Sequence, residues 1–276
     1  MNKITINETK CDKCGICIKI CPVSLIKITD NNFPEIADSK KMLCINCGHC
    51  EAYCPKLALS VSYCNTVAEP PAFANNDISV DSLGNYFRSR RSVRSFTNDI
   101  IDKSVVQKAI SIAAYSPSGK NDQPVHWTIV LEKDKMQKLI DIIIQWAEML
   151  EKEKSPFARI FPASAVIKHY QAGYDMVLRG APALAVTHTS NDSVMGTAAV
   201  TDGIIAMSHF DLILPSLGLG GFWAGFFYMA LKTCDELRKE LNIPNAHSIA
   251  YAYAFGKTKQ KITSFPKRKI LSIDFM

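Results

Sequence analysis

Two short stretches of the sequence are rich in cysteine and share one spacing. The first is CDKCGICIKICP, residues 11–22, and the second is CINCGHCEAYCP, residues 44–55. Each carries three cysteines separated by two residues, then a fourth that is followed directly by proline. Three thiolates in one tight loop can surround one face of an iron–sulfur cubane, and the fourth ligand must then come from elsewhere. The spacing therefore favours iron–sulfur chemistry.

Zinc and disulfides are the alternatives for so many cysteines. Structural zinc usually pairs two C-x2-C knuckles, so that four thiolates hold each ion. Three cysteines in one short loop suit that arrangement poorly. The chain has ten cysteines, and the first residues lack the apolar segment of an export signal. We therefore expect a cytoplasmic protein with reduced thiols rather than disulfides.

The two cysteine motifs make residues 1–63 similar to two-cluster bacterial ferredoxins. This resemblance implies two 4Fe-4S clusters whose ligands are exchanged between the motifs. One cluster would take Cys11, Cys14, Cys17 and Cys54, and the other Cys44, Cys47, Cys50 and Cys21. His49 lies inside the second motif, but the cysteine set is already complete, so we expect this histidine at the surface.

Four later stretches carry groups suited to a phosphate or a flat ring. RSRRSVRSF, residues 88–96, has arginines whose forks match phosphate oxygens. SPSGKNDQP, residues 116–124, offers backbone and side-chain amides to the edge of a heterocycle. The glycines of GLGGFWAGF, residues 218–226, allow close backbone approach, and FPKRK, residues 265–269, is again basic. Each stretch alone is also compatible with an ordinary loop, a solvated basic face or a tail.

Taken together and in this order, the four stretches resemble the FMN-dependent nitroreductase family over residues 83–276. The resemblance implies that the basic stretches hold the FMN phosphate, while the polar loop and the Gly-rich stretch lie on two sides of the flavin ring. The implied phosphate residues are Arg90, Arg91, Ser92, Arg94, Lys267 and Lys269. The implied ring residues are Pro117, Ser118, Asn121, Gln123, Trp223, Ala224 and Gly225. The resemblance also implies a homodimer with FMN at the subunit interface.

The elements that must position these residues follow from apolar periodicity and turn signals. We predict helices at 82–89, 103–115, 134–150, 163–178, 194–214 and 226–241, and strands at 126–131, 183–188, 221–226 and 248–256. The long helix 194–214 would form the core of the dimer. The predicted fold class is α+β: a small ferredoxin-like domain with two 4Fe-4S clusters, residues 1–63, a linker at 64–82, and a nitroreductase-like domain with a helix-covered sheet, residues 83–276.

Composition and charge exclude some partners. The formal net charge is +6, which is lower and less concentrated than nucleic-acid binders usually show. The uncharged run Leu212–Leu231 is long enough for a membrane helix. It contains a proline and four glycines, which fit a helix end, a turn and a strand better. We expect neither a nucleic-acid nor a membrane partner.

The two modules together predict an oxidoreductase. Electrons would pass from a low-potential donor, reduced ferredoxin or NAD(P)H, through the clusters to FMN and then to a nitro group or an activated unsaturated bond. An electron-transfer or redox-sensing module and a reductive dehalogenase-like enzyme are the alternatives. No acid–base pair stands out. His169, Tyr170 and Tyr174 could donate to a substrate or be ordinary helix residues, and Cys64 and Cys234 are expected to be buried structural thiols.

Overall fold

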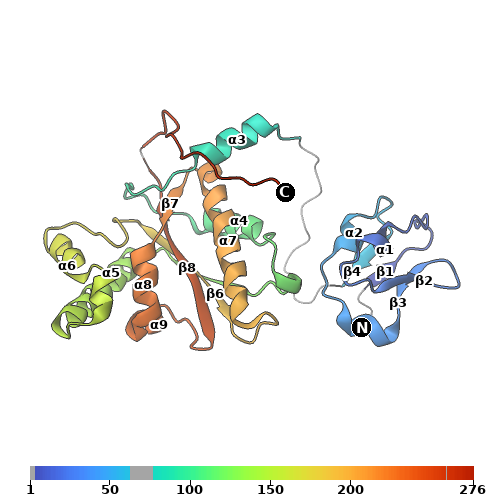
Figure 1. Cartoon of the computed structure of the whole chain (residues 1–276), viewed down its shortest axis with the longest axis horizontal. Helices are drawn as coiled ribbons and strands as arrows, with labels where there is room; N and C mark the ends of the chain where they lie inside the picture. The colour runs from blue at the N-terminus through green and yellow to red at the C-terminus, as the bar shows by residue number, and fades with distance from the viewer. Residues whose placement is uncertain (1–3, 63–76, 259) are drawn as a thin grey trace. The chain divides into compact units, whose positions relative to one another are not determined.

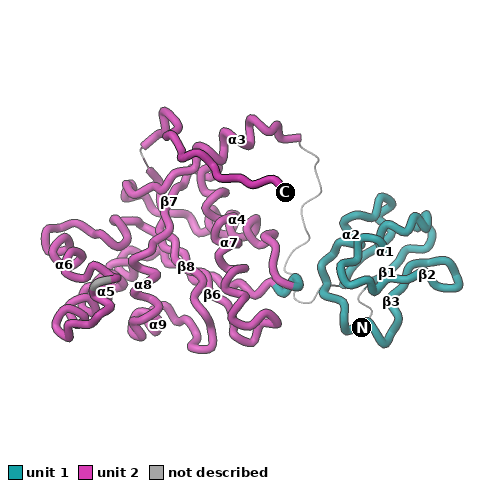
Figure 2. Tube along the Cα trace, in the orientation of Figure 1, with its two compact units in different colours: residues 1–76, 120–122 teal, residues 77–119, 123–276 magenta. Residues whose placement is uncertain are grey.

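The structure is a computed structural model that describes residues 4–62, 77–258 and 260–276. The chain divides into two compact units, shown in Figure 2. The first comprises residues 1–76 and 120–122, and the second comprises residues 77–119 and 123–276. Residues 64–76 of the predicted linker, with Cys64, lie outside the described residues.

The first unit is built from short elements arranged around the cysteine loops. Its elements are β1 (Ile4–Ile6), α1 (Ile16–Ile20), β2 (Ile26–Ile28), β3 (Pro34–Ile36), a 3-10 helix (Asp38–Leu43), α2 (His49–Ala52) and β4 (Leu59–Val61). β1 pairs antiparallel with β4, and β2 pairs antiparallel with β3. Both short helices follow a glycine in the left-handed conformation, Gly15 at φ 72° and Gly48 at φ 73°. Glycine adopts this conformation without steric cost, so the chain can reverse within each motif.

The second unit contains one antiparallel sheet with strand order β5-β6-β8-β7. The strands are β5 (Val125–Val130), β6 (Ala183–Ser190), β7 (Gly220–Trp223) and β8 (His247–Gly256). The helices are α3 (Val80–Ser89), α4 (Lys103–Ala113), α5 (Lys133–Lys152), α6 (Ala163–Gln171), α7 (Val200–Ile213), α8 (Gly225–Thr233) and α9 (Asp235–Glu240). Short 3-10 turns of this unit lie at Pro156–Arg159, Gly196–Ala199 and Leu214–Leu217. A further 3-10 turn, Gly119–Asn121, has its last two residues in the first unit.

Helices cover both faces of this sheet, as Figure 1 shows. Leu184 and Val186 of β6 pack with α5, α8 and α9, whereas Ala183 and Ala185 pack with α4 and α7. Because successive strand residues point to opposite faces, the first half of β6, which is buried on both sides, is apolar throughout, whereas Thr187, His188 and Thr189 are polar residues buried in its second half. α7 lies very close to β8, since a Cβ added at Gly203 would come within 2.5 Å of the Ala250 Cβ. The predicted α+β class is confirmed.

Several predicted boundaries were wrong for local reasons. The helix predicted at 226–241 is two helices, because Cys234 adopts an extended conformation between α8 and α9. The strand predicted at 221–226 ends at Trp223, and α8 begins at Gly225. The helix predicted at 163–178 ends at Gln171. The Asp175 carboxylate then accepts three backbone N–H groups, which holds the chain in a turn.

The predicted helix 194–214 begins with a 3-10 turn, and its α-helical part is α7. The apolar run Leu212–Leu231 is not one helix but the end of α7, a turn, β7 and part of α8. Within the described residues, Gly196–Leu217 is the one helical stretch whose length and apolar composition would allow it to cross a membrane, and 44% of that window is buried in the fold. A core helix has the same properties, and Met207 and Phe210 of α7 pack against the sheet.

Candidate functional site

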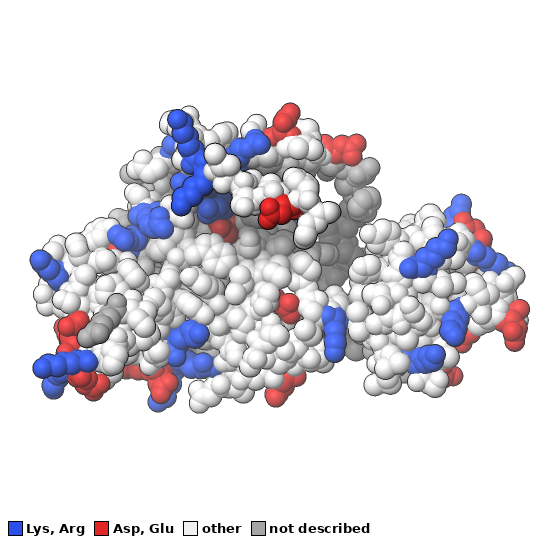
Figure 3. Space-filling model, viewed as in Figure 1, with Lys and Arg blue, Asp and Glu red and all other residues white. Residues whose placement is uncertain are grey.

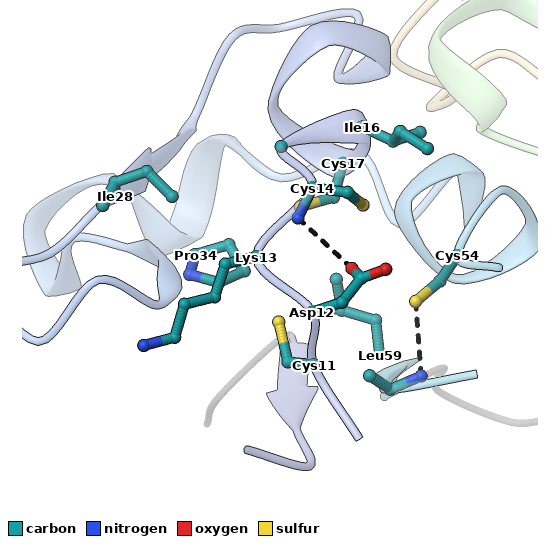
Figure 4. A pocket seen from close by; sticks show the side chains of 12 residues that line it. Cys11, Asp12, Lys13, Cys14, Ile16, Cys17, Ile28, Pro34, Cys54 and Leu59 are labelled. Carbon is teal, nitrogen blue, oxygen red and sulfur yellow. Dashed lines mark hydrogen bonds between the residues drawn. The ribbon is translucent and has the colours of Figure 1, made fainter. Parts of the chain in front are cut away.

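Four cysteines from two distant parts of the sequence line one pocket in the first unit. Figure 4 shows Cys11, Cys14 and Cys17 along the loop and helix α1, with Cys54 approaching from the chain after α2. Ile28, Pro34 and Leu59 supply apolar walls to this pocket. A soft thiolate donor set within an apolar shell suits an iron–sulfur cluster.

A second pocket repeats the arrangement with the remaining cysteines. This pocket is lined by Cys44, Cys47, Cys50 and Cys21. Ile26, Ile36 and Val61 close its sides. Each motif therefore contributes three cysteines to one pocket and its proline-linked fourth cysteine to the other. This is the crosswise juxtaposition that the ferredoxin resemblance implied.

Backbone groups near the cysteines prepare both pockets for charged sulfur. The Leu25 N–H donates to Cys21 Sγ at 3.4 Å, and the Ala58 N–H donates to Cys54 Sγ at 3.3 Å. Such bonds stabilise a thiolate and help to set a cluster's potential. Burial raises the pKa of the Cys50 thiol to about 11, and binding of a metal ion would displace its proton. His49 is exposed, as predicted.

In the second unit, the first basic stretch is fastened to the Gly-rich strand. The Val93 N–H donates to the carbonyl oxygen of Gly221 at 2.9 Å. A Cβ at Gly220 would come within 2.7 Å of Val93, so the two segments are in close contact. The guanidinium of Arg94 lies 5.4 Å from the ring centre of Phe222 on β7. Tertiary structure therefore brings two of the four predicted stretches together.

The predicted phosphate residues differ in their exposure. Arg90 and Arg91 are half-buried, whereas Ser92 and Arg94 are exposed. Lys267 and Lys269 are exposed in the extended tail after β8. Figure 3 shows Lys and Arg side chains gathered at the top of the view, where the chain after α3 and the tail run. Several cations with free donor groups fit a phosphate monoester.

The predicted ring residues of the Gly-rich stretch lie at the end of β7. Trp223 is half-buried, and its ring packs edge-on against Tyr251, with the centroids 4.9 Å apart. Ala224 is fully buried. Gly225 starts α8, so Ala224 and Gly225 form the turn between strand and helix rather than part of a strand.

The polar loop 116–124 has an unusual backbone. Lys120, Asn121 and Gln123 are all left-handed, with φ near 50°. Residues other than glycine rarely adopt this conformation, and strain of this kind tends to gather at functional sites. Ser118 Oγ accepts the Gln123 N–H at 3.0 Å, which helps to hold the turn, and Pro117 is exposed.

Asn121 belongs to the first compact unit. There its Nδ2 donates to the carbonyl oxygen of Asn46 at 3.0 Å. Asn46 is one of the residues that line the second cysteine pocket. The predicted flavin contact of Asn121 is not tested by this geometry and stays a prediction.

Two buried aspartates on α7 contact residues of the predicted FMN stretches. The sequence analysis did not identify these aspartates. Asp202 accepts the Gly119 N–H of the polar loop at 3.2 and 3.3 Å. Asp211 accepts from Trp223 Nε1 at 3.1 Å and from the Tyr253 hydroxyl at 2.6 Å, and Arg90 Nη1 lies 3.5 Å away. Burial of a carboxylate is costly without such partners. Two acidic residues in an otherwise apolar helix were the signal that could have revealed them.

The region 151–178 is held against α5. The Tyr170 hydroxyl donates to Asp141 Oδ1 at 2.7 Å and accepts from Gln137 Nε2 at 2.9 Å. Tyr174 accepts a hydrogen bond from Arg179 and packs edge-on against His169. A substrate role for these side chains remains a prediction. Cys234 is buried, as expected of a structural thiol.

Comparison with protein families matches residues 87–257 to the nitroreductase family and residues 10–58 to the 4Fe-4S dicluster domain. The first match covers more than half of the chain. The chain belongs to the nitroreductase family. It carries in addition an N-terminal 4Fe-4S dicluster domain, so both predicted relationships are confirmed.

Two curated relatives each match part of this nitroreductase-family chain. An Archaeoglobus fulgidus protein described as an NADH dehydrogenase/NAD(P)H nitroreductase is 25% identical over 173 residues, which cover 63% of this chain and 83% of the relative. NAD(P)H-quinone oxidoreductase subunit I of Gloeobacter violaceus is 31% identical over 68 residues, which cover 22% of this chain and 32% of the relative. The chain therefore spans about a third of the length of the latter protein.

Solved structures of the family share the fold of the second unit. A nitroreductase with bound FMN from Bacteroides fragilis aligns with a TM-score of 0.57 and 20% identity, over 70% of this chain and 98% of its own. A nitroreductase with bound FMN from Desulfitobacterium hafniense aligns with a TM-score of 0.52 and 21% identity, over 69% and 97%. At such identities the likeness establishes the fold.

Proposed function

We propose that the protein is an FMN-dependent oxidoreductase that draws electrons from a low-potential donor through two 4Fe-4S clusters. It uses them to reduce an electron-poor organic substrate, either a nitro group or an activated unsaturated bond. The observation that carries this proposal is the pair of four-cysteine pockets in the same chain as a nitroreductase-family domain. Reduced ferredoxin is the proposed donor, and NAD(P)H is the alternative.

The proposal assigns distinct chemistry to the cofactors and to the protein. When bound, the clusters supply single electrons, and FMN can accept them singly and deliver a pair. The protein's own residues bind and orient the cofactors and exclude water from them. The eight cysteines hold the clusters, and the apolar pocket walls limit solvent access to them.

The chemistry of the donor set supports FMN in the second unit. Arg90, Arg91, Ser92 and Arg94 would bind the phosphate, because guanidinium groups match its oxygens and stay charged at all working pH values. Lys267 and Lys269 would join them. Pro117, Ser118, Asn121, Gln123, Trp223, Ala224 and Gly225 would lie around the ring. The hydrogen bond between Val93 and Gly221 supports this assignment, since it joins the phosphate stretch to the ring stretch.

The protein is proposed to act as a homodimer, as the family resemblance implies. Exposed apolar side chains support this. Ile204 on α7 is 39% exposed, and the tail residues Ile270 and Phe275 are 99% and 92% exposed in the single chain. In a homodimer, a second copy of the chain would cover such side chains. Sedimentation of the purified protein tests the proposal, and a monomer at micromolar concentration would oppose it.

Anaerobic purification with counts of iron, sulfide and flavin tests the cofactors. We expect about eight iron atoms, about eight sulfides and one FMN per chain. Zinc in place of iron, or colourless protein after careful reconstitution, would overturn the proposal. Reaction of the dithionite-reduced protein with a nitroaromatic acceptor then tests the activity. Reoxidation that is no faster with the acceptor than without it would favour an electron-transfer or redox-sensing module instead.

The electron donor can be tested separately. In a Cys11→Ala/Cys44→Ala variant that lacks both clusters, reduced ferredoxin should no longer bleach the flavin absorbance. If NADH bleaches it at the wild-type rate in this variant, NADH reaches the flavin directly and the clusters serve another route. If NADH fails in both proteins while ferredoxin succeeds in the wild type, the proposed route is supported.

A further inference from the structure

One buried carboxylate is contacted by polar groups from three separate segments of the second unit, through two hydrogen bonds and one ion pair. Asp211 is only 5% exposed. Its Oδ1 accepts from the Tyr253 hydroxyl of β8 at 2.6 Å, and its Oδ2 accepts from the Trp223 indole of β7 at 3.1 Å. Arg90 Nη1, at the end of α3, lies 3.5 Å from the same Oδ2. The carboxylate therefore joins elements that are far apart in the sequence.

Two of these three donors are residues that the proposed function places at opposite ends of FMN. Arg90 would bind the phosphate, and Trp223 would lie along the ring. The Arg90 guanidinium and the Trp223 indole both contact Oδ2 of Asp211, so this one atom keeps the two side chains close together. Arg90 Nη1 lies 3.5 Å from Asp211, and a guanidinium has five N–H donors, so it can serve a second anion as well.

Tyr253 fixes the carboxylate itself. The tyrosine is fully buried in the core beneath α7. Burial and the neighbouring Asp211 raise the pKa of Tyr253, so the hydroxyl keeps its proton and acts as a donor. One oxygen of Asp211 is thus held by the core, while the other faces the two groups of the proposed site.

We propose that Asp211 is a positioning residue that orients Arg90 for the FMN phosphate and couples that end of the site to Trp223 at the ring end. This inference rests on the proposed function, because it requires FMN in this region. It assigns a role to a carboxylate that touches neither the phosphate nor the ring.

The proposal is tested on the full-length protein by comparing the binding of FMN with that of riboflavin, which lacks the phosphate. Bound flavin is removed, and the dissociation constants of both flavins are measured by fluorescence quenching for the wild type and for Asp211→Asn. Asparagine keeps the size of the side chain but loses its charge and one acceptor oxygen. We expect the affinity for FMN to fall about tenfold more than that for riboflavin, a factor equivalent to about 1.4 kcal/mol.

The Arg90→Gln background shows whether the effect passes through Arg90. In that background, Asp211→Asn should change the affinities for FMN and riboflavin by the same factor, because the effects of two coupled residues are non-additive. Glu148→Gln, on the exposed side of α5, is the matched control, since it makes the same change from carboxylate to amide away from the proposed site. It should leave the ratio of the two affinities unchanged.

The outcomes separate this inference from the proposed function. Equal losses for both flavins in Asp211→Asn, or a loss of FMN affinity that persists in full in Arg90→Gln, would show a merely structural role and overturn the inference. If the wild type binds FMN more tightly than riboflavin and Asp211→Asn shows the same ratio of affinities, the inference is also overturned. The proposed function would then remain intact. A wild type that binds neither flavin would refute the proposed function itself.

Discussion

The exchange of ligands between the two cysteine motifs can be tested with paired substitutions. Cys21 belongs to the first motif in sequence but lines the pocket of Cys44, Cys47 and Cys50. Replacing Cys21 by alanine should therefore disable the cluster of the second motif. Cys54→Ala is the mirror case, because Cys54 lines the pocket of the first motif.

The expected magnitude follows from four sulfurs in each pocket. The wild type should hold two 4Fe-4S clusters with about eight iron atoms, and Cys21→Ala should retain one intact cluster with about four. The double variant Cys21→Ala/Cys47→Ala removes two ligands from one pocket, so one intact cluster should remain. Cys21→Ala/Cys14→Ala removes one ligand from each pocket, so none should remain.

Iron analysis and spin quantification by electron paramagnetic resonance of the reduced protein count the intact clusters. If each motif instead filled its own site, the two double variants would exchange results. Cys21→Ala/Cys14→Ala would then keep one cluster, and Cys21→Ala/Cys47→Ala would keep none. That pattern would refute the crosswise pockets. Flavin content serves as the folding control, because none of the substitutions lies in the second unit.

Three further predictions concern the second unit. Asp202→Asn weakens the anchor of the polar loop at the Gly119 N–H, and we expect it to lower the free energy of unfolding by about 1–3 kcal/mol in urea titrations. Burial, His247 and His126 lower the pKa of His188 to about 4. The unfolded chain therefore binds the proton first, and this group should lower stability by about 1.6 kcal/mol between pH 6.5 and pH 5, a contribution that His188→Asn should remove. Gly203→Ala adds a Cβ that would meet Ala250 at 2.5 Å and should cost about 1–3 kcal/mol by overpacking.

Each of these has a control and a contradicting result. Glu148→Gln, on the exposed side of α5, should leave the unfolding free energy within about 0.5 kcal/mol of the wild type and is the reference for both Asp202→Asn and Gly203→Ala. A wild-type value for Asp202→Asn would show that the loop does not depend on this carboxylate. An unchanged slope of stability with pH in His188→Asn would assign the acid sensitivity to other groups. A neutral Gly203→Ala would mean that α7 can move away from β8.

The positions of most elements could be predicted because their causes are local. The α4 helix begins after Asp102, whose carboxylate accepts the Ser104 N–H at 2.7 Å, and the predicted start near this residue was confirmed. The α5 helix follows its apolar period from Met136 to Ala147. Boundaries failed where a tertiary contact or a single backbone conformation decided them, as at Cys234 and Asp175.

The sequence by itself determined the chemistry of the cysteine module, because two-residue spacing confines three thiolates to one loop whatever surrounds it. Only the tertiary structure decided which donors meet the buried carboxylates of α7. Arg90, Asp211, Trp223 and Tyr253 lie on four elements with no common period. Their meeting depends on how α7 packs on the sheet, and this packing is a property of the whole core rather than of any short segment.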